Sequence, residues 1–204
     1  TLMQEAITKG IQAIGGLEML VAQAVYASEY FHDTVYNKDK IHEIYQELVQ
    51  EKRNIALIGM PTCGKSTIAK MLAEALHREV YDIDTLIEEY THMSIPDIFE
   101  KYGEEYFRDL ESKITEEYSK KNDCIISCGG GVIKRAENLL CLHYNSMIFF
   151  IDRPIELLQA DNYRPLSNDL HKLHTLYKER YDTYCNWADV HIMNTTTLEE
   201  VVES

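Results

Sequence analysis

The chain has 204 residues, 45% of them hydrophobic and 26% charged, as expected for one compact globular domain with some additional structure. Its formal net charge of −14 argues against nucleic acid or an anionic membrane as a partner, because both require basic surface. No apolar run is long enough to predict a membrane span, and no secretory signal pattern opens the chain. Five cysteines without the spacing of a disulfide scaffold favour the reducing cytoplasm.

Residues 1–50 are predicted to form a helical extension. Leu17, Leu20 and Val21 begin an apolar stripe with helical spacing that continues to residue 28. A polar segment at residues 32–40 follows, and a second amphipathic stripe covers residues 41–49. Because the chain has no initiator Met, we expect it to be a piece of a longer polypeptide.

Residues 51–204 are predicted to form an α/β domain, because short β-rich runs alternate with helical runs from residue 54 onward. The strands are expected at residues 55–58, 79–83, 124–128, 147–151 and 190–193. The helices are expected at residues 66–76, from 94 to Gly103, 104–120, 134–144, from Pro154, 169–187 and weakly from 198. This alternation predicts a parallel sheet of about five strands with helices on both faces, which is a three-layer fold.

The run GMPTCGKST at residues 59–67 matches the phosphate-binding pattern G-x-x-x-x-G-K-[ST] between a predicted strand and a predicted helix. Gly59 and Gly64 allow the backbone to turn its N–H groups toward phosphate oxygens. Lys65 is expected to reach the β- and γ-phosphates of ATP, and the hydroxyl of Ser66 to ligate Mg²⁺. The remaining predicted nucleotide contacts are Thr62, Cys63 and Thr67.

Three further features are candidates for the acceptor side. Asp82 and Asp84 are expected at the carboxyl end of the second strand, both on one side, where one serves Mg²⁺ through water and the other a substrate hydroxyl. Arg108 lies early in a predicted helix, and glycines 129–131 follow the third strand with backbone N–H groups open to a ligand. Solvated loop acids, a surface arginine and a flexible turn are the respective alternatives.

Cysteine and histidine side chains raise the alternative of a zinc site. Cys124, Cys128, Cys141 and His143 provide ligand types, but their spacings match none of the usual zinc patterns. We therefore expect Cys124 and Cys128 to pack as thiols on one face of the third strand.

Taken together, these motifs resemble shikimate kinase over about residues 54–195. The resemblance also rests on SIPDIFEKYGEEYFRDLE at 94–111, CGGGV at 128–132, YRPLS around Arg164 and YKERYDTY around Arg180. It implies a P-loop kinase fold that uses ATP and Mg²⁺ to phosphorylate the 3-hydroxyl of shikimate, in the synthesis of chorismate and aromatic amino acids. A gluconate-type kinase and an ATP-binding regulatory module without turnover are the alternatives.

The resemblance implies roles for individual residues on the shikimate side. Asp84 matches the acid that binds the ring hydroxyls and assists the attacking one. Arg108 and Arg180 match a clamp on the carboxylate, for which the guanidinium fork is suited. Gly130, with Gly131 beside it, matches the backbone N–H that meets a shikimate hydroxyl.

On the phosphate side, the resemblance implies that Asp82 is the second-shell acid of magnesium. Arg164 matches the arginine of a lid over the phosphates, where it neutralises charge together with Lys65 and Mg²⁺. The chain departs from the family before this lid, since residues 156–162 contain no arginine to stack on adenine. Gln159 is the nearest candidate replacement.

The front piece has a resemblance of its own. GGLEMLVAQA at residues 15–24 resembles the C-terminal helix of shikimate dehydrogenase. In that family a Gln at the position of Gln23 contacts shikimate, and Gly16 and Met19 lie near the nicotinamide cofactor. No G-x-G-x-x-G dinucleotide motif occurs here. We therefore expect a helical remnant, with a dehydrogenase domain before Thr1 in a longer chain.

Overall fold

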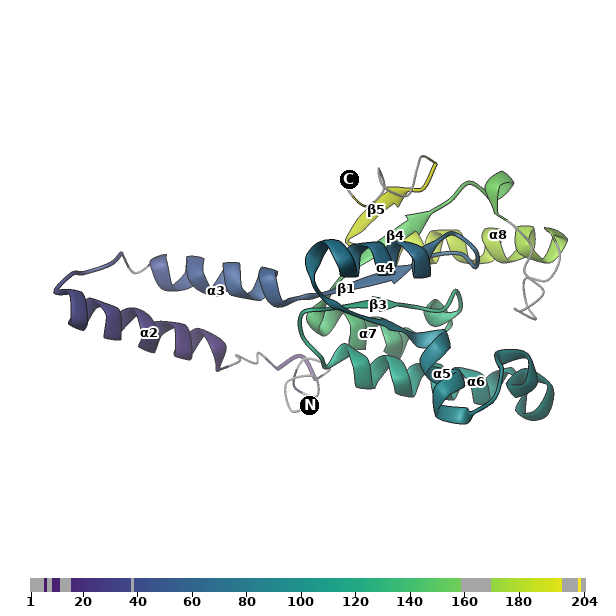
Figure 1. The fold of residues 1–204 in the computed structure, drawn as a ribbon, viewed down its shortest axis with the longest axis horizontal. Coiled ribbons are helices and arrows are strands. Elements are labelled where there is room, and N and C mark those ends of the chain that lie inside the picture. Colours follow the sequence, from purple (N-terminus) through teal and green to yellow (C-terminus); the bar gives the residue numbers. More distant parts are fainter. Residues whose placement is uncertain are drawn as a thin grey trace. The chain divides into compact units, whose positions relative to one another are not determined.

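The computed structural model describes residues 6, 9–11, 16–37, 39–158, 170–195 and 202, and the chain divides into two compact units, Thr1–Lys52 and Arg53–Ser204 (Figure 1). In the first unit, α2 (Leu17–His32) and α3 (Asp39–Lys52) form a helical hairpin. The two helices were expected from the two apolar stripes. Helix α2 ends where Asp33 adopts a left-handed conformation with φ 50°.

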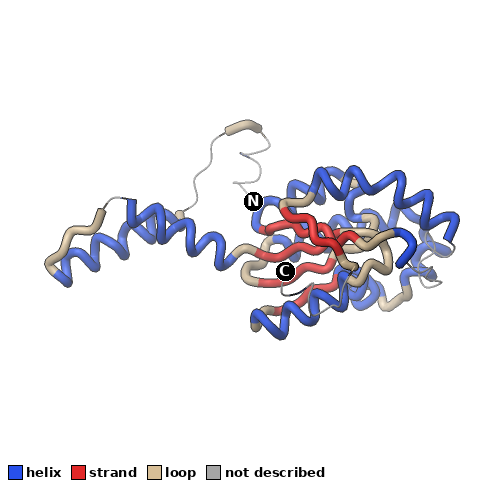
Figure 2. The backbone as a smooth tube through the Cα atoms, turned by 90° about the horizontal axis from the view of Figure 1, so that it is seen from above, coloured by secondary structure: helices blue, strands red, loops and turns tan. Residues whose placement is uncertain are grey.

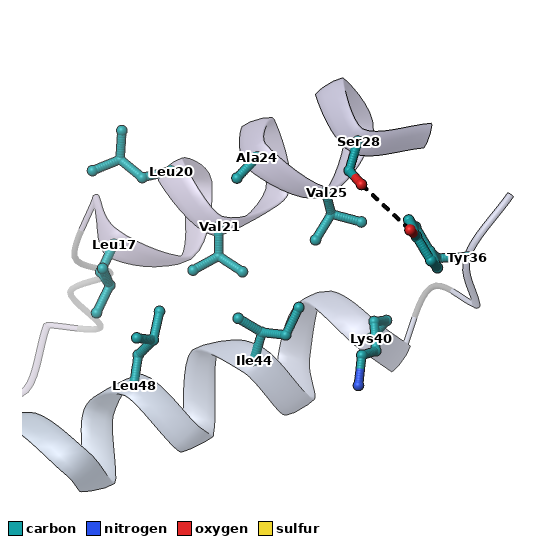
Figure 3. Close-up of a pocket in the computed structure, with 10 residues that line it drawn as sticks. All are labelled: Leu17, Leu20, Val21, Ala24, Val25, Ser28, Tyr36, Lys40, Ile44 and Leu48. Carbon is teal, nitrogen blue, oxygen red and sulfur yellow. Dashed lines mark hydrogen bonds between the residues drawn. The ribbon is translucent and has the colours of Figure 1, made fainter. Parts of the chain in front are cut away.

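The hairpin has a small core of its own. Val21 and Val25 are the buried residues of α2, and α3 has none. They point toward Ile44 in a mainly apolar cavity of about 490 Å³ between the two helices (Figure 3). Several large apolar side chains of this unit, including Tyr30 and Phe31, are at least 80% exposed. The hairpin therefore buries only part of its apolar surface.

The second unit is built on a five-stranded parallel sheet in the order β2-β3-β1-β4-β5. The strands are β1 (Asn54–Ile58), β2 (Glu79–Asp82), β3 (Cys124–Ser127), β4 (Ser146–Asp152) and β5 (Val190–Met193). All of β3 and most of β1 are buried, which requires cover on both faces. The predicted α/β sheet is confirmed, with strand ends within about one residue of those expected.

Helices cover both faces of this sheet (Figure 2). They are α4 (Lys65–Leu76), α5 (Ile83–Thr91), α6 (Ile95–Ser119), α7 (Ala136–Asn145) and α8 (Leu170–Trp187), with short 3₁₀ turns η1 (Val132–Lys134) and η2 (Ile155–Leu157). No helix of the described residues combines the length and apolar character needed to cross a bilayer. Because all five strands are parallel, their carboxyl ends meet at one edge, where the loops after β1, β2 and β3 come together.

Two helices differ from the expectation. Helix α5 was not predicted, and it begins directly after Asp82, whose side chain caps it by accepting a hydrogen bond from the Thr85 N–H at 3.2 Å. Asp84 therefore lies in the first helical turn and not on a strand, so the expected strand alternation is the wrong reason for its direction. Pro154 opens only the one-turn η2 among the described residues, where a helix was expected.

The region of Gly103 follows the sequence expectation closely. Ser94 caps α6, since its hydroxyl accepts a hydrogen bond from the Asp97 N–H at 3.3 Å. Gly103 has φ 82° and ψ 173°, which interrupts the helical path at the point where one helix was expected to end and the next to begin. After the kink, the second half of α6 carries Arg108 in its first turns and ends at Ser119, shortly before β3 begins at Cys124.

Candidate active site

The loop between β1 and α4 has the backbone of a phosphate cradle. Gly59 has φ 146°, and a Cβ added to it would lie 2.5 Å from the carbonyl oxygen of Ile151 on the neighbouring strand. Gly64 caps α4 with φ 100°, so both glycines adopt conformations that other residues avoid. Thr62 lies between them at φ 63°, a left-handed conformation that is rare for a β-branched residue.

Lys65 is buried at the base of this loop, with 4% of its surface exposed. Its Nζ donates to the carbonyl oxygens of Gly59 at 3.0 Å and Met60 at 2.8 Å, and lies 3.6 Å from the Sγ of Cys63. The ammonium is therefore inside the loop, surrounded by neutral acceptors. Phosphate oxygens would be stronger acceptors for it, because a charge-assisted hydrogen bond is stronger than a neutral one.

Ser66, the second residue of α4, is joined to the end of β2. Its hydroxyl donates to Oδ2 of Asp82 at 2.6 Å. Both residues line a cavity of about 190 Å³ together with Asp84 and Glu88. Hydroxyl and carboxylate oxygens are the ligand types that Mg²⁺ prefers, so the chemistry of this pair fits the expected metal. Asp82 and Asp84 thus face one cavity, although α5 and not a strand orients Asp84.

Arg108 is held in place by acids on both sides. Its Nη1 donates to Oε2 of Glu111 at 2.6 Å, and its Nε and Nη2 lie 3.3 Å from Oε1 of Glu104. Glu104 also accepts from Nζ of Lys134 at 2.6 Å. Arg108 as a whole is 6% exposed. This network therefore fixes the orientation of its guanidinium away from bulk water.

Glu111 is a buried acid of the site that the sequence reasoning missed, although it ends the quoted run FRDLE. Its side chain is 1% exposed, and its Oε1 has no hydrogen-bond partner among the described residues. Burial raises the pKa of Glu111, the Arg108 guanidinium opposes that shift, and the negative charge of Asp84 adds to it. A donor placed beside Oε1 would satisfy the buried carboxyl.

The glycines after β3 form a floor that no side chain could replace. A Cβ on Gly129 would lie 2.6 Å from Oδ1 of Asp84, and one on Gly131 would lie 2.0 Å from Nη1 of Arg108. A Cβ on Gly130 would lie 2.8 Å from Cδ of Pro61 in the phosphate loop. The three positions are therefore glycines because acid, arginine and phosphate loop all approach the backbone closely.

Arg180 on α8 approaches the same floor from another side. Its Nη1 donates to the carbonyl oxygen of Gly130 at 2.6 Å, and the hydroxyl of Tyr184 donates to the same oxygen at 2.5 Å. Burial raises the pKa of Tyr184, so the phenol stays a donor. The Nε and Nη2 of Arg180 are buried and have no hydrogen-bond partner among the described residues. A buried guanidinium edge whose N–H groups lack acceptors would bind an anion favourably.

The other expected residues divide into those that the structure describes and those that it does not, and one residue was not expected. Cys63 is fully buried beneath the loop, and Thr67 lies in the first turn of α4. Arg164 and Gln159 lie outside the described residues, so the lid and the adenine contact stay predictions. Buried Asn194, after β5, was missed, yet its Nδ2 donates to the carbonyl of Cys63 at 2.7 Å.

The cysteines expected to pack as thiols are buried. Burial raises the pKa of Cys124 to about 11 and raises that of Cys128 further. All five cysteines are free thiols. Among the described residues, no three His, Cys, Asp or Glu side chains gather as a metal site of their own.

Phosphates at Lys65 and an anionic acceptor at the arginines would meet across the backbone of Gly130. This arrangement defines a P-loop kinase that acts on a small acceptor.

Comparison with known proteins identifies the kinase family to which the chain belongs. A family model described as shikimate kinase matches residues 61–204. Shikimate kinase of Clostridium botulinum (strain Eklund 17B / Type B) is 43% identical over 155 residues, which is 74% of this chain and 93% of that protein. The chain belongs to the shikimate kinase family.

Solved structures agree with this assignment. Shikimate kinase from Acinetobacter baumannii in complex with shikimate has a TM-score of 0.72 and 32% identity, covering 77% of this chain and 92% of that one. Shikimate kinase from Aquifex aeolicus vf5 has a TM-score of 0.65 and 36% identity, covering 74% and 92%. The family match lies within the second unit, so the resemblance of residues 15–24 to shikimate dehydrogenase stays a proposal.

Proposed function

We propose that this chain transfers the γ-phosphate of ATP to the 3-hydroxyl of shikimate, giving shikimate 3-phosphate and ADP on the route to chorismate and aromatic amino acids. The assignment of the acceptor rests on the pair of arginines around the glycine floor. Arg180 has a buried guanidinium edge without a partner among the described residues, and Arg108 contacts Gly131 beside it. Two arginines at a small buried site suit an acceptor with a planar carboxylate.

On the donor side, the loop residues bind and orient the phosphates. Backbone N–H groups of residues 59–67 surround the phosphates, and Lys65 exchanges its carbonyl acceptors for phosphate oxygens. Ser66 and Asp82 would hold Mg²⁺, which would supply positive charge to neutralise the phosphates. We propose that Arg164 adds a further positive charge from the lid.

On the acceptor side, Asp84 orients the attacking hydroxyl. Its carboxylate accepts the hydrogen bond of the 3-hydroxyl and takes its proton as the hydroxyl oxygen bonds to the γ-phosphorus and the bond from that phosphorus to the ADP oxygen breaks. Gly130 and Gly131 offer backbone N–H groups to the ring hydroxyls, while Arg108 and Arg180 hold the carboxylate at the far end. Because phosphoryl transfer needs mainly in-line placement and charge neutralisation, these contacts suffice for turnover.

Coupled ADP release with shikimate, gluconate and nucleoside monophosphates tests the assignment. We expect ADP release that depends on shikimate alone. Arg108→Ala should raise the KM for shikimate by about tenfold or more with little change in the KM for ATP, because a charged hydrogen-bonding partner of the carboxylate is lost. Equal losses on both substrates would contradict the role given to Arg108, and absence of shikimate-dependent ADP would contradict the assignment.

We also propose that residues 1–50 are a helical remnant related to shikimate dehydrogenase, in a longer chain where a dehydrogenase domain precedes Thr1. The support is the resemblance of residues 15–24, including Gln23, and the apolar surface that the hairpin leaves open. Residues 51–204 would then be the kinase domain. The free thiols suit action in the cytoplasm.

A double substitution that buries two charges in the hairpin tests whether the hairpin takes part in phosphoryl transfer. Val21→Asp with Val25→Asp should disrupt the hairpin and leave kinase turnover within about twofold of the parent, because the site residues all lie in the second unit. A large loss of turnover in protein whose second unit is folded would overturn this independence.

A further inference from the structure

Asn194 connects the edge strand to the phosphate loop. It follows β5 directly and is 2% exposed. Its side-chain Nδ2 donates to the carbonyl oxygen of Cys63 at 2.7 Å, although 131 residues separate the two in sequence. Its backbone N–H donates to the carbonyl oxygen of Asp152 at the end of β4, at 2.6 Å. The amide is thus fixed to the sheet on one side and to the loop on the other.

The carbonyl of Cys63 belongs to the same peptide unit as the N–H of Gly64. In a trans peptide the C=O and N–H point in opposite directions, and the described chain has no cis peptide. A hydrogen bond that ties the Cys63 carbonyl to Asn194 therefore turns the Gly64 N–H away from Asn194, toward the inside of the loop. In a loop of this type that is where phosphate oxygens bind.

This peptide unit needs an external restraint. Gly64, at φ 100°, has no Cβ to limit rotation of the peptide before it. The carbonyl of Cys63 also lies before the first turn of α4, so the helix does not hold it. The buried side chain of Asn194, directly after β5, supplies this restraint.

We propose that Asn194 is a positioning residue for ATP, which sets the direction of the Gly64 N–H in the phosphate cradle. The proposal rests on the proposed function, since it assumes that the loop binds ATP. The side chain must be a donor at this place. Asp would put a carboxylate oxygen against the Cys63 carbonyl, and it would add a negative charge behind a loop that binds anions.

The proposed role predicts different effects on the two substrates. The hydrogen-bond partners of Asn194 among the described residues lie on the loop and β4, and none is a residue proposed to bind the acceptor. A loss at Asn194 should weaken binding of nucleotide while leaving shikimate binding in place. A merely structural role would lower stability without separating the two substrates.

The experiment compares Asn194→Asp and Asn194→Ala with Asn54→Asp in the full chain. Asn54 is a matched control, because it is also buried and its Nδ2 donates to a backbone carbonyl, that of Lys121, at 2.7 Å. It lies at the amino end of β1, at the opposite edge of the sheet from the loop. ADP affinity is measured by calorimetry, KM values by ADP release, and folding by thermal unfolding.

We expect Asn194→Asp to weaken ADP binding and raise the KM for ATP by about tenfold or more, and Asn194→Ala by less, as for a phosphate-facing N–H turned out of place. The KM for shikimate should stay within about twofold of the parent. Asn54→Asp should lower stability and leave both KM values unchanged.

Unchanged ADP affinity in folded Asn194→Asp would overturn the proposal. Loss of folded protein in both Asn194 variants, where Asn54→Asp still folds, would assign the bond a structural role and overturn it too. Because calorimetry with ADP needs no acceptor, it tests Asn194 even if shikimate is not phosphorylated. Absence of ADP binding by the parent would instead refute the proposed function, and with it the assumption on which the inference rests.

Discussion

Replacing Tyr184 by Phe removes one hydroxyl from the floor of the site. That hydroxyl donates to the carbonyl of Gly130 at 2.5 Å, and Nη1 of Arg180 donates to the same oxygen at 2.6 Å. By the trans-peptide relation, the two donors together direct the N–H of Gly131 to the opposite side. The ring itself stacks on Phe150 at 5.2 Å between centroids, a contact that Phe would keep.

The size of the effect of Tyr184→Phe follows from the hydrogen bonds that the Gly130 carbonyl keeps. The Gly130 carbonyl keeps its charged donor, Arg180, so no acceptor is left unsatisfied. The cost in unfolding free energy should then be that of one neutral hydrogen bond, about 1 kcal/mol. With one restraint left on the Gly130–Gly131 peptide, the KM for shikimate should rise about two- to fivefold, which corresponds to about 0.4–1 kcal/mol. The KM for ATP should not change.

The assay is the initial rate of ADP formation against shikimate at saturating ATP, together with denaturant unfolding. Tyr181→Phe is the control, because its hydroxyl, on the same helix, donates to Oδ2 of Asp152 at 3.0 Å and not to the glycine floor. It should lower stability without raising the KM for shikimate. If Tyr184→Phe loses stability but binds shikimate as the parent does, or if both substrates lose equally, the reasoning is refuted.

Three further substitutions test the site. Asp84→Asn should lower kcat by about a hundredfold or more with ATP affinity intact, because the acceptor of the hydroxyl proton is lost; single-turnover rates would check this, and a normal rate would refute the role. Ser66→Ala should raise the Mg²⁺ concentration needed for half-maximal ADP release, measured by magnesium titration, and an unchanged titration would contradict the assigned ligand. Gly131→Ala should raise the KM for shikimate by about tenfold, since its Cβ would lie 2.0 Å from Nη1 of Arg108; unchanged kinetics would show that Arg108 can move without loss.

The strand, turn and helix around residues 59–67 were predicted from the sequence because the conformation of such a loop is set locally. Gly59, Lys65 and Ser66 act through backbone turns and helix termini formed by their own neighbours, and strand alternation with helices was enough to predict the parallel sheet. The direction of Asp84 was expected for the wrong reason, since the turn of α5 that Asp82 caps was not recognised.

What the sequence did not reveal was the support behind the site. Asn194 and Tyr184 act on carbonyls 131 and 54 residues away, and such contacts exist only once the sheet order is set. Tyr184 did carry a signal, because it lies four residues after Arg180 and so on the same face of a helix. Asn194 followed a short strand of mixed burial and carried none.

The close approach of Gly130 to Pro61 has a consequence for the reaction itself. A single glycine backbone and a single proline ring separate the floor under the acceptor from the loop around the phosphates, with only 2.8 Å between Cδ of Pro61 and the place of a Cβ on Gly130. In the proposed reaction, this close contact would limit the distance between the phosphate loop and the backbone that meets the acceptor. A methyl group added at Gly130 would clash with the Pro61 ring, so under the proposed function a short path for the phosphoryl group would depend on the absence of a side chain at this position.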